Sequence, residues 1–291
     1  MSTIAFIGLG NMGGPMAANL VKSGHEVLGV DLVAELREAA LAAGVKIAGS
    51  AAEAAAQADV VVTMLPAGRH VLGVWGELTP KAGALWIDSS TIDVDSARKA
   101  HKLAQDKGAL SVDAPVSGGV GGAKGATLTF MCGGSEAAFA AAKPVLERMG
   151  KRIVHCGAAG AGQAAKICNN MILGATMIAT CEAFVLGEKL GLSHQALYDV
   201  ASTSSGQSWS LSSYCPVPGP VPASPANNGY KPGFAAALML KDLKLAQEAA
   251  LASGANTPLG AAAAQLYALF NASGGAGADF SGIIEFLRGR G

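Results

Sequence analysis

The stretch Gly8-Leu9-Gly10-Asn11-Met12-Gly13 decides the fold, because its three glycines stand between a predicted strand and a predicted helix. The apolar run 3–7 precedes this stretch, and residues 14–23 follow it with helical spacing. In this context the first glycine allows a tight turn, the second lets a pyrophosphate approach the backbone, and the third lets helix and strand pack closely. The motif therefore predicts a dinucleotide site at residues 8–13 rather than an ordinary glycine-rich turn, with the phosphates at the helix N-terminus.

An acidic residue follows the next predicted strand, 26–30. Asp31 lies 18 residues after Gly13 and would accept hydrogen bonds from the ribose hydroxyls of adenosine. The next basic residue is Arg37, and a carboxylate in this place repels a ribose phosphate. We therefore expect NAD rather than NADP as the cofactor.

The alternation of strands and helices continues through the first half of the chain. Ligands of doubly wound sheets bind beyond the carboxyl ends of the strands, so Leu65, Pro66 and Thr91 are candidate cofactor contacts. Thr91 has an alternative role in capping the helix expected from Val94. The pattern predicts an α/β fold whose N-terminal domain, residues 1–158, is a Rossmann-type doubly wound sheet. Its further elements are strands at 59–65, 84–87, 110–113, 128–132 and 153–155 and a helix at 136–149.

Helical spacing dominates the second half of the chain. Helices are expected at 163–190, 194–203, 234–251, 258–270 and 279–287, around an irregular, proline-rich segment at 204–233. At 1.5 Å per residue the first helix would be roughly 40 Å long. Because this helix is apolar nearly all round, we expect neighbouring helices and part of a second protomer to bury it.

One lysine lies near the start of this long apolar helix. Lys166 and Asn170 are four residues apart and share one helix face, with Asn169 beside them. The helix dipole and desolvation both disfavour a protonated amine here, which would make Lys166 a usable proton acceptor. We interpret Lys166 as the catalytic acid and base. The alternative is a solvated lysine at the rim of a core helix.

A run of small residues, Asp113-Ala114-Pro115-Val116-Ser117-Gly118-Gly119-Val120-Gly121-Gly122, lies between two predicted strands. Consecutive small residues expose successive backbone N–H groups, and the serine hydroxyl adds a donor. Such a nest suits an anion, for example a carboxylate. A flexible loop between strands is the alternative, but beside a nucleotide site the pattern favours substrate binding.

Composition limits the class of protein. The 291 residues are 51% hydrophobic, and 21 Lys and Arg balance 21 Asp and Glu. A chain without net charge has no field that attracts nucleic acid or an anionic membrane, so we expect small molecules or copies of the chain as partners. The longest apolar stretch, 171–186, contains Glu182, which favours a buried helix over a membrane span.

The cysteines and histidines carry no metal or disulfide pattern. Five cysteines are scattered without a Cys-x-x-Cys pair, and the five histidines are equally dispersed, so we expect neither a zinc site nor a disulfide framework. The apolar run 3–7 meets glycines before it could become a signal-peptide core, and we expect no export segment. These features favour a location in the reducing cytoplasm.

Four ordered signatures together resemble the β-hydroxyacid dehydrogenase family, most closely its 3-hydroxyisobutyrate dehydrogenase branch. They are residues 8–20, residues 113–119, Gly160-x-Gly162-x-x-x-Lys166-x-x-Asn169-Asn170, and Lys241-Asp242-Leu243. The resemblance runs through nearly the whole chain. It implies an all-α second domain over residues 159–291, which agrees with the helical spacing there.

The resemblance also implies residue roles. Lys166 would handle the proton of the substrate hydroxyl, and Lys241 would close over cofactor and substrate. Trp209 would line the substrate pocket, with a purely packing role as the alternative, and Phe234 is a further candidate cofactor contact. The residues expected to hold the substrate are Ser117, Gly118, Gly119, Asn169 and Asn170.

The implied reaction is the NAD-dependent oxidation of 3-hydroxyisobutyrate to methylmalonate semialdehyde, a step of valine degradation. Other members of the family act on L-serine or tartronate semialdehyde, which share the carboxylate and the β-hydroxyl. Imine reductases share the architecture, but their position matching Lys166 is usually not lysine. Relatives without the lysine serve as binding or scaffold proteins. We further expect a homo-oligomer, a dimer or a tetramer.

Overall fold

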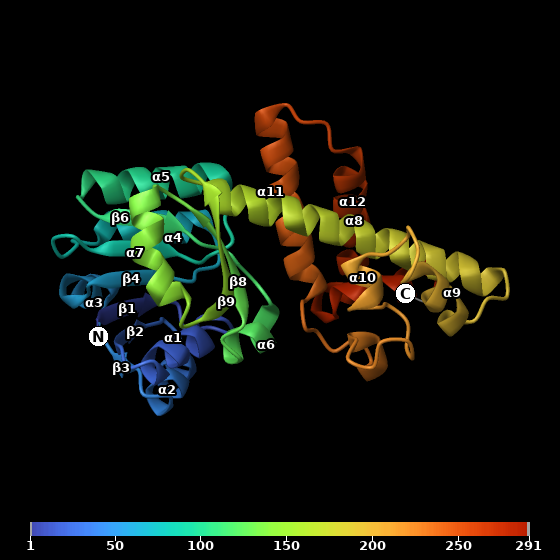
Figure 1. Cartoon of the computed structure of the whole chain (residues 1–291), viewed down its shortest axis with the longest axis horizontal. Helices are drawn as coiled ribbons and strands as arrows, with labels where there is room; N and C mark the ends of the chain where they lie inside the picture. The colour runs from blue at the N-terminus through green and yellow to red at the C-terminus, as the bar shows by residue number, and fades with distance from the viewer. Residues whose placement is uncertain (1, 290–291) are drawn as a thin grey trace. The chain divides into compact units, whose positions relative to one another are not determined.

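The first half of the chain forms a mostly parallel sheet of nine strands among the described residues, 2–289, of this computed structural model (Figure 1). Its strand order is β3-β2-β1-β4-β5-β6-β8-β7, with β9 also paired to β8. The chain reverses its direction of growth between β1 and β4, which makes this the switch point where doubly wound sheets bind ligands. The strands are β1 Thr3–Ile7, β2 Glu26–Val30, β3 Lys46–Ile47, β4 Val60–Thr63, β5 Leu85–Asp88, β6 Leu110–Asp113, β7 Val116–Ser117, β8 Leu128–Gly133 and β9 Gly150–Gly157.

Helices cover both faces of this sheet, because alternate side chains of the strands are apolar on both sides. In β1, Ile4 and Phe6 join one buried cluster while Ala5 and Ile7 join the other. The first cluster is completed by α1, α2, α6 and α7, and the second by α3, α4 and α5. These helices are α1 Gly13–Lys22, α2 Ala34–Ala42, α3 Ala51–Gln57, α4 Gly68–Glu77, α5 Val94–Asp106, α6 Gly119–Lys124 and α7 Glu136–Leu146.

Two tryptophans lie at the centre of the second cluster. The rings of Trp75 on α4 and Trp86 on β5 are 5.1 Å apart, edge to face, and both side chains are fully buried. Such aromatic pairs contribute more than their buried area alone. The pair fixes α4 against the strand that ends at the ligand-binding edge.

The second half of the chain is helical. Its core consists of apolar side chains from α8, α11, α12 and α13, including Phe184, Leu243 and Tyr267. Gly174 lets α8 and α11 approach closely, since a Cβ there would lie 3.0 Å from the Leu243 side chain. The elements are α8 Ala161–Lys189, α9 His194–Ala201, α10 Trp209–Ser212, η1 Pro225–Asn228, α11 Ala236–Ser253, α12 Pro258–Ala272, η2 Gly275–Gly277, η3 Phe280–Gly282 and α13 Ile283–Leu287.

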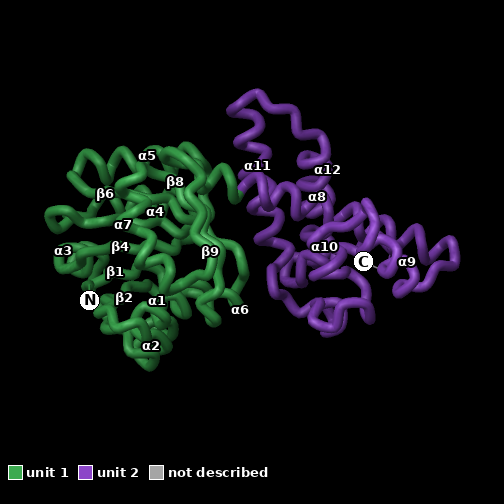
Figure 2. The backbone as a smooth tube through the Cα atoms, viewed as in Figure 1, with its two compact units in different colours: residues 1–166 green, residues 167–291 purple. Residues whose placement is uncertain are grey.

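The chain divides into two compact units, residues 1–166 and 167–291 (Figure 2). The division falls inside α8, whereas the sequence places the second domain from residue 159. The start of α8 is pressed against the sheet, because a Cβ on Gly162 would lie 2.3 Å from the carbonyl oxygen of Met131 on β8. This packing assigns the first turns of α8 to the unit that contains the sheet.

The predicted fold class is confirmed, and the differences concern short elements and strand ends. The strand expected at 59–65 ends at Thr63, because the Leu65 N–H turns away to donate to the Ser90 hydroxyl. The two-residue strands β3 and β7 were not predicted. By length and composition α8 could also cross a membrane, a test that core helices of soluble proteins pass as well.

Candidate active site

The glycine turn after β1 has the geometry that its spacing predicts. Gly8 has φ +97°, and a Cβ on it would lie 2.3 Å from the Met64 carbonyl oxygen. A Cβ on Gly13 would lie 1.9 Å from the Gly8 carbonyl oxygen, so helix and turn are in close contact. Around a Cβ on Gly10, by contrast, no atom of the surrounding described residues lies within 4 Å. The turn is therefore closed at Gly8 and Gly13 and open at Gly10, where a pyrophosphate could approach.

Asp31 links this turn to the end of β2. Its Oδ2 accepts a hydrogen bond of 2.7 Å from the Leu9 N–H, and its Oδ1 accepts one of 2.9 Å from the Val33 N–H. Arg37 donates to the backbone carbonyl oxygens of Asp31 and Leu32, each at 2.9 Å. The first basic side chain after the acid is thus hydrogen-bonded to the backbone beside it.

The ends of β4 and β5 are joined by a hydrogen-bond network. The Leu65 N–H donates to Ser90 Oγ at 2.8 Å, and that hydroxyl donates to Asp88 Oδ1 at 2.6 Å. The Thr63 hydroxyl donates to the same oxygen at 2.8 Å. The network holds Leu65 in place, next to the exposed Pro66.

Asp88 is a buried carboxyl group that the sequence reasoning missed. Burial raises its pKa to about 6, against the opposing effect of the hydrogen bonds from Ser90 and Thr63. Its Oδ2 accepts no hydrogen bond from any side chain or backbone group of residues 2–289. The only local signal was an acid directly after three apolar strand residues.

The capping role considered for Thr91 belongs to another residue. Helix α5 begins at Val94, as expected, and its cap is Asp93, whose Oδ1 accepts the Ser96 N–H at 2.7 Å. Thr91 is half-buried in the loop between β5 and this helix.

The small-residue run 113–122 is ordered into two elements. Ser117 pairs with Thr129 at the end of β7, and α6 begins at Gly119. Gly118 and Gly119 have φ +132° and +59°, a backbone conformation that favours glycine at both positions. The segment therefore contains a short strand and the start of a helix, and its role in holding a substrate stays a prediction.

Asp113, the last residue of β6, binds the start of α8. Its Oδ1 accepts the Gly160 N–H at 2.8 Å, and its Oδ2 accepts the Gln163 N–H at 2.9 Å. The ring Nε2 of His101 lies 2.9 Å from Oδ1. A carboxylate in this position satisfies N–H groups that the helix cannot pair itself. This role was not predicted, because a strand of the sheet supplies the cap.

Lys166 follows on the same helix and is only 7% exposed, so it is not a solvated lysine at the rim. One turn further, the side-chain Nδ2 of Asn170 donates to Asp242 Oδ2 at 2.5 Å, and Asn169 donates to Asn170 Oδ1 at 3.0 Å. Lys241 Nζ lies 3.8 Å from Asp242 Oδ1. Asp242 thus connects the two signatures that contain Asn170 and Lys241, a function that the sequence reasoning did not assign.

Trp209 and Phe234 belong to one row of aromatic rings. Trp209 stacks on Tyr214 with a centroid distance of 4.9 Å, and Tyr214 stacks on Phe280 at 5.3 Å. Phe234 meets the last ring of this row, Phe280, edge to face, with 5.8 Å between the ring centroids. Trp209 remains 52% exposed, and its place in the substrate pocket stays a prediction.

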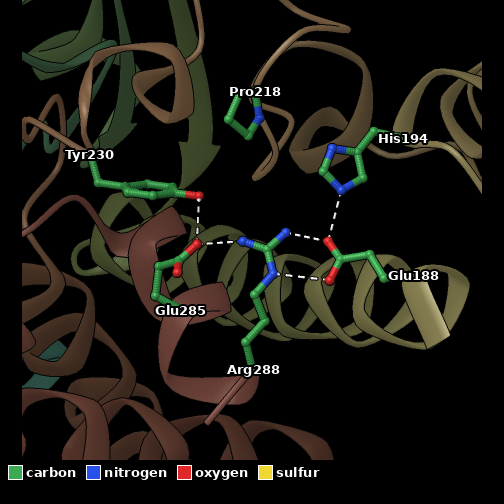
Figure 3. A pocket seen from close by; sticks show the side chains of 6 residues that line it. All are labelled: Glu188, His194, Pro218, Tyr230, Glu285 and Arg288. Carbon is green, nitrogen blue, oxygen red and sulfur yellow. Dashed lines mark hydrogen bonds and ion pairs between the residues drawn. The ribbon is translucent and has the colours of Figure 1, made fainter. Parts of the chain in front are cut away.

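A cavity of about 460 Å³ lies near the end of α8, and none of the predicted site residues lines it (Figure 3). Arg288 pairs there with Glu188 and with Glu285, and His194 Nε2 lies 2.7 Å from Glu188 Oε1. The hydrogen bond from Arg288 lowers the pKa of Glu188. We interpret this cluster as an ion-pair network that fixes α13 to α8.

Metal-binding side chains are not grouped in this structure. Across residues 2–289, no three His, Cys, Asp or Glu side chains are placed to hold a metal ion. All five cysteines are free thiols.

Comparison with known proteins agrees with the geometry. Residues 3–157 match the family described as the NAD binding domain of 6-phosphogluconate dehydrogenase. Residues 160–287 match the family described as NAD-binding of NADP-dependent 3-hydroxyisobutyrate dehydrogenase. The first unit accordingly binds NAD.

Several relatives cover the whole chain. A probable 3-hydroxyisobutyrate dehydrogenase of Mycobacterium tuberculosis is 56% identical over 100% of this chain and 99% of its own length. An NAD-dependent L-serine dehydrogenase of Pseudomonas aeruginosa is 48% identical over 99% and 98% of the two chains. A solved structure of M. tuberculosis 3-hydroxyisobutyrate dehydrogenase with L-serine superposes with a TM-score of 0.97 at 56% identity, over 99% of each chain. The chain therefore belongs to the 3-hydroxyisobutyrate dehydrogenase family, a group of NAD-dependent β-hydroxyacid oxidoreductases.

Proposed function

We propose that the protein oxidises 3-hydroxyisobutyrate to methylmalonate semialdehyde with NAD, as a step of valine degradation, and that Lys166 is the general base. The observation that carries this proposal is a buried lysine near the start of α8, where Asp113 binds the helix to the sheet. A buried amine at a helix N-terminus favours the neutral form that can accept a proton.

The proposed chemistry assigns one task to each group of residues. Gly10 leaves room for the pyrophosphate, and Asp31 accepts hydrogen bonds from the adenosine ribose. Backbone N–H groups of residues 117–119 and the Asn170 amide hold the substrate carboxylate. Bound NAD supplies the hydride acceptor. Neutral Lys166 takes the proton of the substrate hydroxyl and becomes an ammonium. At the same time the C–H bond of the carbon that carries this hydroxyl breaks, and its hydride goes to the bound cofactor.

L-serine is the second candidate substrate. It shares the carboxylate and the primary β-hydroxyl with 3-hydroxyisobutyrate, and one relative that is 48% identical to this chain is named an NAD-dependent L-serine dehydrogenase. Tartronate semialdehyde is a further candidate in the reducing direction, because hydride transfer to its aldehyde would give a product with the same carboxylate and primary β-hydroxyl. A non-catalytic binding protein is the alternative outside the enzymes, and the buried Lys166 argues against it.

The test is NAD reduction, measured by absorbance, with both β-hydroxy acids and with each nicotinamide cofactor. Lys166→Ala should lower kcat by about 10² to 10⁴ while NAD affinity is kept. Lys189→Ala, which removes an exposed lysine from the same helix, is the matched control and should leave kcat unchanged. Undiminished turnover in Lys166→Ala would refute the assignment, and NAD binding without turnover of any substrate would favour a scaffold.

We also propose that the protein is a homo-oligomer, a dimer or a tetramer, in the cytoplasm. Ile172, Leu186 and Leu190, on α8 and directly after it, are each at least 60% exposed, and a second protomer would bury these apolar side chains. Light scattering that finds only monomers at micromolar concentration would contradict the proposed homo-oligomer. Cell fractionation that finds the protein outside the cytoplasm would contradict the proposed location.

A further inference from the structure

Gln163 is a fully buried amide between the cofactor side of the sheet and the lysine helix. It is 0% exposed, and it lies three residues before Lys166 on α8. Its Oε1 accepts the Ile92 N–H at 3.1 Å, and its Nε2 donates to the Ser90 carbonyl oxygen at 2.7 Å. Both ends of the side chain are therefore bonded to the loop that follows β5.

This loop also holds a residue on the cofactor side. The hydroxyl of Ser90, whose carbonyl oxygen binds Gln163, accepts the Leu65 N–H. A continuous series of hydrogen bonds thus runs from Leu65, beyond the end of β4, through Ser90 to the first turns of α8. Residues three apart on a helix are neighbours, so the series ends beside Lys166.

The backbone of the same helix turn is held independently. Asp113 accepts the N–H groups of Gly160 and Gln163, and Gly162 leaves no room for a side chain between the helix and the sheet. Asp113 and Gly162 determine how closely the start of α8 approaches the sheet. The Gln163 side chain, in contrast, attaches the start of α8 to the loop of residues 90–92.

We infer that Gln163 is a positioning residue for Lys166, which holds the reacting amine in register with the strand ends that bind NAD. The inference rests on the proposed role of Lys166. The helix start, the loop and the end of β4 all belong to the first unit, so the amide joins them within one body. Displacement of a catalytic group by about 1 Å can lower turnover by about 10², which sets the upper limit of the effect expected when the two bonds are lost.

The test is a double-mutant cycle of Gln163→Met with Lys166→Ala. Methionine keeps the length and flexibility of the side chain and removes both hydrogen bonds. Gln163→Met alone should lower kcat by about 10- to 100-fold and change the KM for NAD less than about twofold. In the Lys166→Ala background it should change the residual kcat less than about twofold, because no amine remains to be positioned. Gln57→Met, the same change at an exposed position of α3, is the matched control.

The outcomes separate this inference from the proposed function. Wild-type kcat in Gln163→Met, or equal losses in both backgrounds, overturns the positioning role and leaves the role of Lys166 intact. Full turnover in Lys166→Ala overturns the proposed function itself. If Gln163→Met does not fold, Gln163→Glu replaces it, since only a protonated glutamate can donate to the Ser90 carbonyl oxygen. Its kcat for semialdehyde reduction, divided by that of the wild type, should rise as pH falls from 8 to 6, and a constant ratio contradicts the inference.

Discussion

Gly10→Ala and Gly13→Ala each add one methyl group to the same glycine turn, but the structure predicts opposite effects. Without cofactor, Gly13→Ala should destabilise the protein and Gly10→Ala should stabilise it. At Gly13 the new Cβ would lie 1.9 Å from the Gly8 carbonyl oxygen, where ordinary contact needs at least 3.4 Å. Helix α1 must therefore shift by about 1.5 Å, and such overpacking costs about 1–3 kcal/mol. At Gly10 the methyl group would have no atom of the surrounding described residues within 4 Å, and alanine should stabilise by about 0.4–1 kcal/mol because it restricts the unfolded chain.

With NAD bound, Gly10→Ala should be less stable than the wild type, the reverse of its effect without cofactor. NAD at a hundredfold excess over its Kd stabilises the wild type by about 2.7 kcal/mol, and most of this should be lost when a methyl group occupies the path of the pyrophosphate. The assay is urea unfolding followed by tryptophan fluorescence, with and without NAD. A Gly10→Ala protein that is destabilised without NAD, or that keeps the full NAD increment, would refute the reading of the glycine turn.

Two further predictions concern buried charges. Asp88 has a folded pKa of about 6 against 3.8 for the free group, so the folded state binds more protons between these values. The free energy of unfolding should then fall by roughly 2 kcal/mol as pH rises from 4 to 6, and Asp88→Asn should lack this slope; identical pH profiles from urea unfolding would contradict it. Arg288→Met should cost about 1–3 kcal/mol near neutral pH, because Glu188 and Glu285 lose their cation, with a smaller difference below the ordinary glutamate pKa. Calorimetry from pH 7 down to about pH 3 measures this, because the lowered pKa of Glu188 keeps its carboxylate charged below the ordinary range. A loss of stability that does not depend on pH would show that the ion pairs contribute nothing.

The sequence was most informative where structure is local. A glycine turn between a strand and a helix requires particular residues at fixed spacing, so β1, α1 and β2 were predicted to within a residue or two. The two-residue strands β3 and β7 have no alternation to detect, and α3 is a run of alanines without an apolar stripe. Their positions are set by the strands beside them.

In the candidate site, too, the residues that could be predicted are those related by local spacing along the chain. Lys166 and Asn170 could be proposed because a helix brings residues four apart to one face. The roles of Asp113, Gln163 and Asp242 could not, because their partners lie 47 to 73 residues away in the chain. A carboxylate that caps a distant helix looks in the sequence like any acid after a strand.

The placement of the three tryptophans provides a way to follow each unit separately. Trp75 and Trp86 are sealed inside the first unit, while Trp209 lies half-exposed in the second. In the native protein iodide should quench the emission of Trp209 alone, so quenched and unquenched fluorescence report on different parts of one sample. Loss of the shielded signal during denaturation then marks the opening of the nucleotide-binding unit, whatever state the helical unit is in.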